Sequence, residues 1–539
     1  MKNYKIFRKN GNYLFKIAIV FIVAMASSCD SNFLNEDLKE APGPANVLTN
    51  TAGFEGAVLG LYDLQRAEYF DPGQCAGEAY GIFQTGLDIS LSALHHGCMQ
   101  NLELLGSNVQ PATYSSFWNW GYEMVGNANQ IISALDNKGI NWDKPTDRNE
   151  IEAVARFFRA YSYRTMMYAY GPLPLVKELI KPFRNDYTRA PISEIQDLII
   201  NDLKFAAANL PATTTNDGAL VKAAAQHYLG EMYLYTNKPD LAEIELKKIT
   251  ESGNYKLMTT RFGNSLNQPG DVFSDMFKTG NANRSKGNLE GIWVQQWEFD
   301  VIGGAFGGGW ETPWDRRDQV PFYSSVKGFI LADSLGGRGI GRIRPMKWWV
   351  DSYEAQDIRN SEFNIRRKWY YNNPALPDLF GKLAPITDAS RINGSLYEAT
   401  TKFNFGVTAR NPTFIPSLKD KYIVRLADTW LLLAEAQMKQ NKLTDAAASI
   451  NKIRNRAGAT PVASGAVTMD YILNERAREL YGEEARRFTL IRTGKFMERV
   501  LALNAAAAPN FKPFNQLLPI PQTAIDANTG AKLEQNPGY

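Results

Sequence analysis

Catalytic and metal-binding side chains are scarce in this sequence of 539 residues, which contains three histidines and three cysteines. His95, His96 and Cys98 lie close together, but adjacent side chains point in different directions and no second group of candidate ligands lies nearby. The sequence also lacks the patterns GxSxG, HExxH and GxxxxGK[ST], which mark hydrolases, zinc proteases and phosphate-binding loops. We therefore expect no catalytic residue, no metal ion and no cofactor.

The sequence also lacks a large surplus of positive or negative charge. The chain has 59 Lys and Arg against 56 Asp and Glu, a formal net charge of +3. Five of the basic residues and none of the acidic ones lie within residues 1–28, so the rest of the chain has 54 against 56, or −2. Because no basic stripe is available to neutralise phosphates, nucleic acid is not an expected partner.

Long hydrophobic runs are absent except for IAIVFIVAMA at residues 17–26, which is too short to cross a bilayer and has the length of a signal-peptide core. Basic residues precede this run, and Cys29 follows it after small residues. The arrangement resembles the lipobox of a bacterial lipoprotein, which implies cleavage before Cys29 and a lipid on its sulfur. We predict a signal peptide at 1–28 and a lipidated tether at 29–50. An ordinary signal peptide followed by a chance cysteine is the alternative.

Two cysteines remain in the chain after Cys29. An exported protein meets an oxidising compartment, so Cys75 and Cys98 are a possible disulfide pair. Two free, buried thiols are the alternative, and the residues alone leave both open.

Helical patterns dominate residues 51–254 and 421–539. In RLADTWLLLAEAQMKQ, for example, apolar residues recur at i, i+4, i+7 and i+11. Thr444 fits the N-cap of the following helix and Gly458 fits the position just beyond its end. Antiparallel helix pairs with small residues at their contacts are typical of tetratricopeptide-like repeats. The charged stretch at 473–496 indicates an ion-pair network that holds helix ends together.

The middle region, residues 255–420, is rich in glycine and tryptophan and has few helix signals. Its stretch GGAFGGGWETPWDRR, residues 303–317, fits no phosphate-binding pattern. Tryptophans in loops usually mark binding surfaces, because exposed apolar area is costly. Indole faces stack on the flat C–H faces of sugars, while acids and arginines bind the hydroxyl groups. The candidate ligand-binding residues are Trp310, Trp314, Asp315, Arg316, Trp348, Trp349 and Trp369.

Several motifs in one order resemble a known family. CDSNFLN follows the lipobox, VARFFRAYSYRTMMYAYGPLPLV lies in the first half, and RLADTWLLLAEAQ, INKIRNRAG and ERARELYGEEARRFTLIRTGKF follow in the second. The chain then ends on LLPIPQTAIDANTGAKLEQNPGY. Together these motifs are similar to those of the SusD/RagB family, the surface nutrient-binding lipoproteins of Bacteroidetes.

The resemblance implies a mainly α fold with about four tetratricopeptide-like helix pairs and a loop-rich ligand-binding subdomain. It also implies a lipid anchor in the outer membrane, facing outward, and a SusC-like TonB-dependent transporter as partner, on which the protein acts as a lid. The expected cargo is an oligosaccharide. Peptide capture by the same architecture, a surface glycoside hydrolase with two facing carboxylates, and an intracellular helical-repeat scaffold are the alternatives.

Overall fold

The structure is a computed structural model that describes residues 44–69, 84–92, 111–180, 184–298, 301, 313, 315–406 and 417–539. The predicted signal peptide and most of the predicted tether lie outside these residues. So do Cys29, Cys75, Cys98, Trp310 and Trp314.

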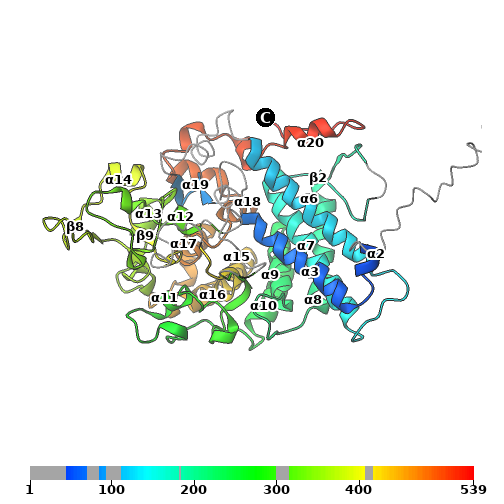
Figure 1. The fold of residues 1–539 in the computed structure, drawn as a ribbon, viewed down its shortest axis with the longest axis horizontal. Helices are drawn as coiled ribbons and strands as arrows, with labels where there is room; N and C mark the ends of the chain where they lie inside the picture. Colours follow the sequence, from blue (N-terminus) through cyan, green and yellow to red (C-terminus); the bar gives the residue numbers. More distant parts are fainter. Residues whose placement is uncertain are drawn as a thin grey trace, which may run out of the picture.

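Helices that flank the middle region form a scaffold in which successive helices pack side by side, α6 on α7, α7 on α8, α8 on α9, α9 on α10, and α10 on α15 (Figure 1). The predicted mainly α fold is confirmed. The scaffold helices are α2 (Pro44–Val47), α3 (Thr51–Arg66), α6 (Pro111–Ala134), α7 (Asp147–Tyr170), α8 (Ile192–Asn209), α9 (Lys222–Tyr235), α10 (Pro239–Thr250), α15 (Leu426–Lys439), α16 (Leu443–Arg456), α17 (Met469–Leu480), α18 (Arg486–Arg492), α19 (Phe496–Leu503) and α20 (Gln522–Ala527).

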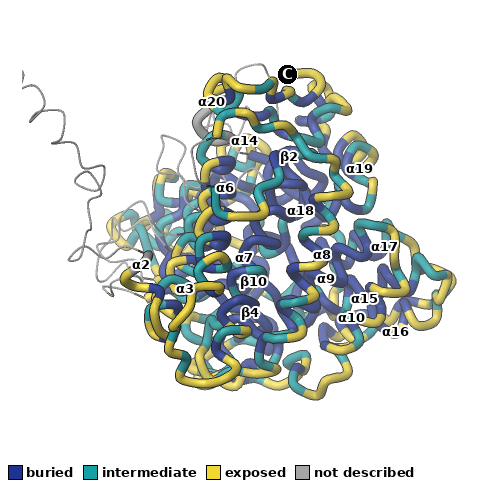
Figure 2. The backbone as a smooth tube through the Cα atoms, turned by 90° about the vertical axis from the view of Figure 1, so that its right-hand side faces the viewer, coloured by how far each residue is buried: buried dark blue, intermediate teal, exposed yellow. Residues whose placement is uncertain are grey.

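The largest core surrounds α7, which is buried along most of its length (Figure 2). Phe157 and Phe158 are fully buried there, and the Trp293 ring packs edge-on against the Phe157 ring with 5.3 Å between centroids. Aromatic residues thus fill the space between α7 and its neighbours. The nearly continuous aromatic and apolar sequence of this helix is explained by contacts on several sides.

Two helix pairs repeat the same turn. Residues 236–238 join α9 to α10, and residues 440–442 join α15 to α16. Asn237 and Asn441 have left-handed backbone conformations, with φ of 55° and 59°. In both turns the next amide donates to the carbonyl five residues back, from Lys238 to Tyr233 (2.7 Å) and from Lys442 to Gln437 (2.9 Å). The two helix pairs therefore share the backbone conformation and hydrogen bond of their turns as well as the pattern of their helix faces.

The predicted ends of α16 are half right. Gly458 lies just beyond the helix with φ 69°, as predicted. Thr444 was the expected N-cap, but the helix begins one residue earlier, and the capping position is Lys442, whose side chain makes no cap hydrogen bond. The Asn441 turn fixes the entry to the helix, so a hydroxyl cap is not needed.

The middle region consists of short elements. The strands form antiparallel pairs, β1 with β5, β2 with β3, β4 with β10, β6 with β9 and β7 with β8. Within residues 255–420 the elements are α11 (Val272–Met276), β4 (Gly291–Gln295), α12 (Asp315–Gln319), β5 (Ile343–Pro345), α13 (Lys347–Asp351), β6 (Ile365–Arg366), β7 (Trp369–Tyr370), β8 (Leu383–Ala384), α14 (Asp388–Ile392) and β9 (Ala399–Thr400). The remaining strands lie outside the middle region: β1 (Ser90–Ser92), β2 (Leu173–Pro174) and β3 (Arg189–Ala190) precede it, and β10 (Lys421–Arg425) directly follows it. The pair of β4 and β10 joins residues on both sides of the predicted boundary at residue 420. The predicted domain boundaries therefore stay predictions.

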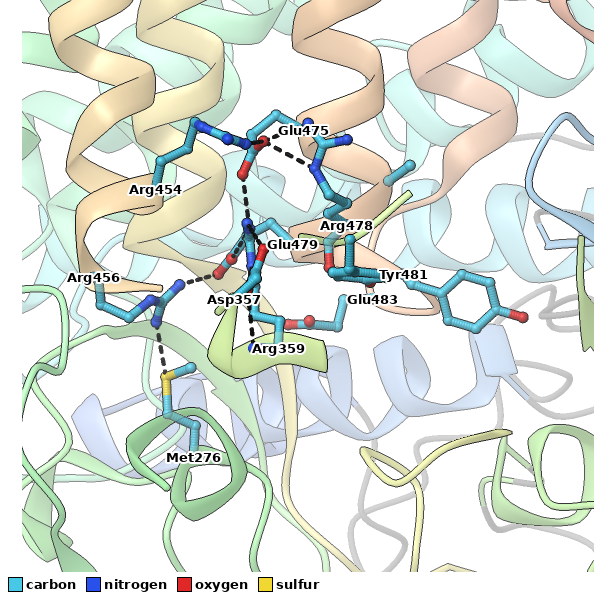
Figure 3. Close-up of polar contacts among 12 residues, drawn as sticks. Met276, Asp357, Arg359, Arg454, Arg456, Glu475, Arg478, Glu479, Tyr481 and Glu483 are labelled. Atoms are coloured by element: carbon cyan, nitrogen blue, oxygen red, sulfur yellow. Dashed lines mark hydrogen bonds and ion pairs between the residues drawn. The ribbon is translucent and has the colours of Figure 1, made fainter. Parts of the chain in front are cut away.

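A buried network of charges joins the middle region to the scaffold (Figure 3). The guanidinium of Arg359 contacts Asp357 (2.7 Å), Glu475 (2.8 Å) and Glu479 (2.9 Å). Arg425, at the end of β10, contacts Glu290 (2.9 Å), Glu479 (2.6 Å) and Glu483 (2.6 Å). Arg454, Arg456, Arg478 and Lys402 complete the set. The ion-pair network predicted for residues 473–496 is confirmed.

The acids of this network are held in their charged form. Burial by itself raises the pKa of Glu479, but Arg456, Arg425 and Arg359 hold that pKa well below its ordinary value. Burial also raises the pKa of Glu475, but Arg359, Arg478 and Arg454 outweigh it and lower that pKa to about 2. Glu475 and Glu479 are therefore ionised at neutral pH, and removal of either acid leaves buried cations with one fewer partner.

The left-handed turns give a first prediction. Asn441→Ala places a Cβ in a conformation that disfavours it, so we expect unfolding free energy to fall by about 1 kcal/mol. Asn441→Gly removes the same side chain without that backbone cost, so it should be close to neutral. Urea denaturation followed by circular dichroism measures both. Equal losses for the two variants would show that the asparagine side chain, rather than the backbone conformation, matters.

The ion network gives a second prediction. Glu479→Gln leaves Arg359, Arg425 and Arg456 with one fewer buried anion, so unfolding free energy should fall by about 3–5 kcal/mol. Glu498→Gln is the matched control, because Glu498 is exposed and pairs with Lys495 on the surface at 2.8 Å. That change should cost less than about 1 kcal/mol. Similar losses for both would refute a special role for the buried network.

Candidate ligand-binding site

Two strands and a short helix bring the middle region against the scaffold at one face. Lys421 of β10 lies opposite Gln295 of β4 in the antiparallel register. The amide of Ser417 donates to the carbonyl of Pro313 at 3.0 Å. The residues just before α12 and the residues just before β10 therefore lie side by side. The sequence stretch 303–317 therefore ends beside the start of β10.

Polar side chains from separate segments gather at this face, and we call them the polar belt. They come from the end of α3 and the turn after it, the end of β4, the first turn of α12, and the start of β10. The polar belt consists of Gln65, Arg66, Glu68, Gln295, Trp297, Asp315, Lys419 and Lys421. Arg66 and Lys419 are half-buried and the other six are buried, so a ligand meets the belt first at these two side chains.

Hydrogen bonds fix the amide part of the belt. Gln295 donates from Nε2 to Oε1 of Gln65 at 2.9 Å, and its own Oε1 accepts from Nε1 of Trp297 at 2.8 Å. The guanidinium of Arg66 lies over the Trp297 ring, 5.3 Å from its centroid. The Trp297 backbone amide donates to Asp420 at 2.9 Å. The end of β4 is thus held from both sides.

Charge in the belt is strongly influenced by burial. Burial raises the pKa of Glu68 to about 7, although the Tyr161 hydroxyl donates to its carboxylate at 2.6 Å and Lys421 lies nearby. Burial lowers the pKa of Lys419 to about 8 and also lowers that of Lys421, while Asp315 favours the charged form of both. The belt therefore has acid and ammonium groups whose protonation responds to small changes in their surroundings.

Asp315 and Arg316, both predicted ligand contacts, lie on α12 at this face. Asp315 belongs to the belt, and its carboxylate also accepts from the Arg316 amide at 2.8 Å. Arg316 is fully buried; it donates from Nη1 to the Phe405 carbonyl at 2.8 Å and stacks over the Phe405 ring. Direct ligand contact by Arg316 is therefore corrected, because its guanidinium fastens α12 to the chain near residue 405.

The predicted tryptophans that the structure describes, Trp348, Trp349 and Trp369, do not form one platform. Trp348 donates to the Asp88 carbonyl at 2.6 Å and is half-buried. Trp349 is 2% exposed, donates to the Ala477 carbonyl at 2.7 Å and packs on Tyr481.

Trp369 lies in a separate core, 1% exposed, stacked on Tyr323 with its Nε1 donating to the Tyr397 carbonyl at 3.0 Å. Ligand contact by Trp349 and Trp369 is corrected, because burial leaves neither ring a face for a ligand. Contact by Trp310 and Trp314 stays a prediction, since both lie outside the described residues.

The sequence reasoning missed Lys419, Lys421, Gln295 and Glu68. One signal was available, because Lys419 and Lys421 are two residues apart at the start of a strand-like run and so share a face. Glu68 and Gln295 gave no such signal, because more than 200 residues separate them along the chain.

One group in the scaffold has the composition of a catalytic triad without its accessibility. His227 Nδ1 lies 3.0 Å from the Thr429 hydroxyl, and Nε2 lies 3.5 Å from Asp428. Thr429 is fully buried, His227 is 2% exposed, and burial lowers the pKa of the imidazole. A substrate has no approach to this hydroxyl, and the contacts of His227 with Asp428 and Thr429 join α9 to α15.

Two features are absent from the residues that the structure describes. No three histidine, cysteine, aspartate or glutamate side chains among them are arranged to hold a metal ion. No helix in that part of the chain combines the length and apolar character needed to span a bilayer.

Comparisons with known proteins identify the class. A model of the SusD family matches residues 399–539, and a model described as "Starch-binding associating with outer membrane" matches residues 85–234. The two matches lie on either side of most of the middle region and include most of the scaffold helices. The chain belongs to the SusD/RagB family.

One curated relative and one solved structure match nearly the whole chain, and a second relative matches a shorter part of it. SusD-like protein P25 of Formosa agariphila is 23% identical, with 95% of this chain and 96% of that protein covered. The starch-binding protein SusD of Bacteroides thetaiotaomicron is 34% identical over 22% of this chain and 21% of its own. Surface glycan-binding protein A from Bacteroides thetaiotaomicron, solved in complex with laminarihexaose, superposes with TM-score 0.69 at 19% identity, covering 90% of this chain and 100% of that one.

The acid of the belt gives a third prediction. The pKa of Glu68 rises from 4.5 to about 7 on folding, so its favourable contribution is complete below pH 4.5 and is lost as pH rises through 7. Glu68→Gln has no carboxyl group at this position, so the variant does not lose this stability as pH rises. Relative to wild type, the variant should gain about 3 kcal/mol of unfolding free energy between pH 4.5 and pH 8.

Urea denaturation at the two pH values measures this gain. Glu123→Gln, an exposed acid on α6, is the matched control and should follow the wild-type profile. Parallel profiles for Glu68→Gln and wild type would show that Glu68 ionises normally in the folded protein.

Proposed function

We propose that this protein captures oligosaccharides at the cell surface and passes them to a SusC-like TonB-dependent transporter, on which it acts as a lid. The observation that carries the proposal is the likeness in fold to surface glycan-binding protein A over 90% of this chain, together with a polar belt that includes Asp315, the residue that follows Trp314 in the sequence. A lid requires a broad, stable surface, which a curved helical scaffold supplies.

The geometry suits a ligand rich in hydroxyl groups. The belt supplies amide, carboxylate and ammonium groups that internal hydrogen bonds already hold in place, so little side-chain freedom is lost on binding. Trp310 and Trp314 directly precede α12, and we propose them as the aromatic surfaces on which sugar rings stack. Binding by a few such contacts is weak, and weak binding allows the cargo to leave for the transporter.

Location and mode of action complete the proposal. A diacylglycerol on Cys29 would anchor the protein in the outer membrane, facing outward, with residues 29–50 as tether. The description of the matched family model, which refers to association with the outer membrane, supports this location. The protein acts by equilibrium binding and not as an enzyme, a proposal supported by the burial of the triad-like group around His227.

A fourth prediction tests the site. The soluble form, without residues 1–29, is screened by calorimetry against a panel of polysaccharides and peptides. The double variant Trp310→Ala, Trp314→Ala should lose at least tenfold in affinity for the glycan that wild type binds, because stacking contributes about 1 kcal/mol or more for each ring. Tyr370→Ala is the matched control, since Tyr370 is a half-exposed aromatic on β7.

Three outcomes are informative. A loss confined to the tryptophan variant supports the site. Unchanged affinity in a folded variant would place the glycan elsewhere on the protein. Binding of peptides and of no polysaccharide would overturn the glycan proposal itself.

A further inference from the structure

A cavity lies between α6, the segment that follows β2, and residues 522–533 near the C-terminus, and it shares no residue with the polar belt. Its volume is about 420 Å³, within the range of about 300–1,000 Å³ that is typical of small-ligand sites. The labels of α6, β2 and α20 lie together in both views of the scaffold (Figure 1, Figure 2). Val125, Asn129 and Leu533 are buried and form the floor, whereas Gly126 and Glu178 are exposed and lie at the mouth.

Hydrogen bonds hold the walls of the cavity in place. Asn129 donates from Nδ2 to the carbonyls of Val176 at 3.1 Å and Glu178 at 3.3 Å. Asn528 donates to the Tyr187 carbonyl at 2.8 Å and accepts from the Tyr187 amide at 2.8 Å. The walls are thus fixed by contacts within the chain, so a ligand has little to rearrange when it binds.

The interior of the cavity is mainly apolar. Trp118, Tyr122 and Tyr187 contribute aromatic rings, and the centroids of the first two lie 4.9 Å apart. The Tyr122 hydroxyl donates to the Pro174 carbonyl at 2.9 Å, so this polar group is already engaged in the wall. The hydroxyl groups of a sugar would lose water here without gaining matching partners, which disfavours a glycan. A ligand with an aromatic or aliphatic body suits these walls.

The charge at the mouth is negative. Glu178 is the one charged residue among the described residues that line the cavity, and it forms no ion pair with any of the residues that the structure describes. Arg184 lies over the Tyr187 ring, but it pairs with Asp186 at 2.8 Å. Lys177 lines a different hollow, against α8. A cation that enters the mouth therefore meets a carboxylate that no arginine or lysine neutralises, beside aromatic rings whose faces attract positive charge.

Gly126 keeps the mouth wide. A Cβ at this position would meet no atom within 4 Å, so packing in the described part of the chain does not require glycine here. Gly121 on the same helix differs, because a Cβ there would lie 2.2 Å from Sδ of Met166. A larger side chain at residue 126 is therefore compatible with the fold and would occupy the entrance of the cavity.

We infer that this cavity binds a small organic amine. The aromatic or aliphatic body of the amine lies among Trp118, Tyr122 and Tyr187, and its ammonium group lies beside Glu178 at the mouth. Aromatic rings together with a carboxylate distinguish such a cation from a neutral or anionic molecule of the same shape. The site is separate from the proposed glycan site and does not depend on glycan capture.

The experiment compares probes of similar shape and different charge. Tryptamine is a cation, tryptophol is its neutral alcohol and indole-3-acetate is an anion, while octylamine combines the ammonium group with an aliphatic body. Calorimetry measures each affinity with the soluble form without residues 1–29, which keeps every described residue. Wild type should bind at least one of the two amines, and tryptamine, if bound, at least tenfold more tightly than tryptophol or indole-3-acetate, with an affinity that falls as salt rises.

Variants assign the binding to the cavity. Gly126→Leu should weaken amine binding at least tenfold, because the leucine occupies the mouth. Gly60→Leu is the matched control, since a Cβ on Gly60 in the interior of α3 also meets no atom within 4 Å and Gly60 does not line the cavity. Glu178→Gln should bring the ratio of tryptamine to tryptophol affinity near one, whereas Glu150→Gln, an exposed acid on α7, should leave that ratio unchanged. Thermal melting confirms that each variant folds.

Several results would overturn the inference. Equal affinities for tryptamine, tryptophol and indole-3-acetate would show that the cavity does not select amines. Undiminished amine binding in folded Gly126→Leu would place the amine elsewhere on the protein. Failure of folded wild type to bind either amine at millimolar concentration would refute the site itself. Glycan capture is measured separately with polysaccharides, so it stands or falls independently of these results.

Discussion

The buried ion network around Glu475 and Glu479 is the interaction on which the rest of this structure depends. Burying so many charges is unfavourable unless each one finds its partner, so only one relative placement of the contributing segments is stable. Those segments come from the middle region, from the strand pair β4 and β10, and from the ends of α16 and α17. A region of short strands and loops, with a small core of its own, thereby takes a defined position on a helical scaffold.

That placement determines where a ligand face can form. Arg425 ends β10 inside the network, while Lys419 and Lys421 at the other end of the same segment belong to the polar belt. The strand therefore connects the buried ion network to the polar belt, which begins four residues away and is itself largely buried. Side chains held in this way need little rearrangement to receive a ligand, which favours binding without catalysis.

Much of the scaffold could be predicted from the sequence, because its signals are local: the period of the apolar residues, Gly458 beyond a helix, and opposite charges one turn apart. The ligand residues could not. A loop tryptophan has the same sequence signal whether exposed or buried, and Trp369 owes its burial to Tyr323 and Tyr397, which lie far from it in the chain. Glu68 and Gln295 likewise meet other belt residues only through folding, so no spacing could reveal them.

The contrast between the network and the polar belt supports the proposed site. In the network, each arginine contacts the carboxylates that packing brings to it, and the result is rigid and closed to solvent. In the belt, burial raises the pKa of Glu68 to about 7 and lowers the pKa of Lys419 to about 8, so these groups are held less firmly in their charged form. Selection for stability alone would favour apolar residues at such positions, since burying charge costs free energy. Their presence beside α12 therefore favours a role in binding.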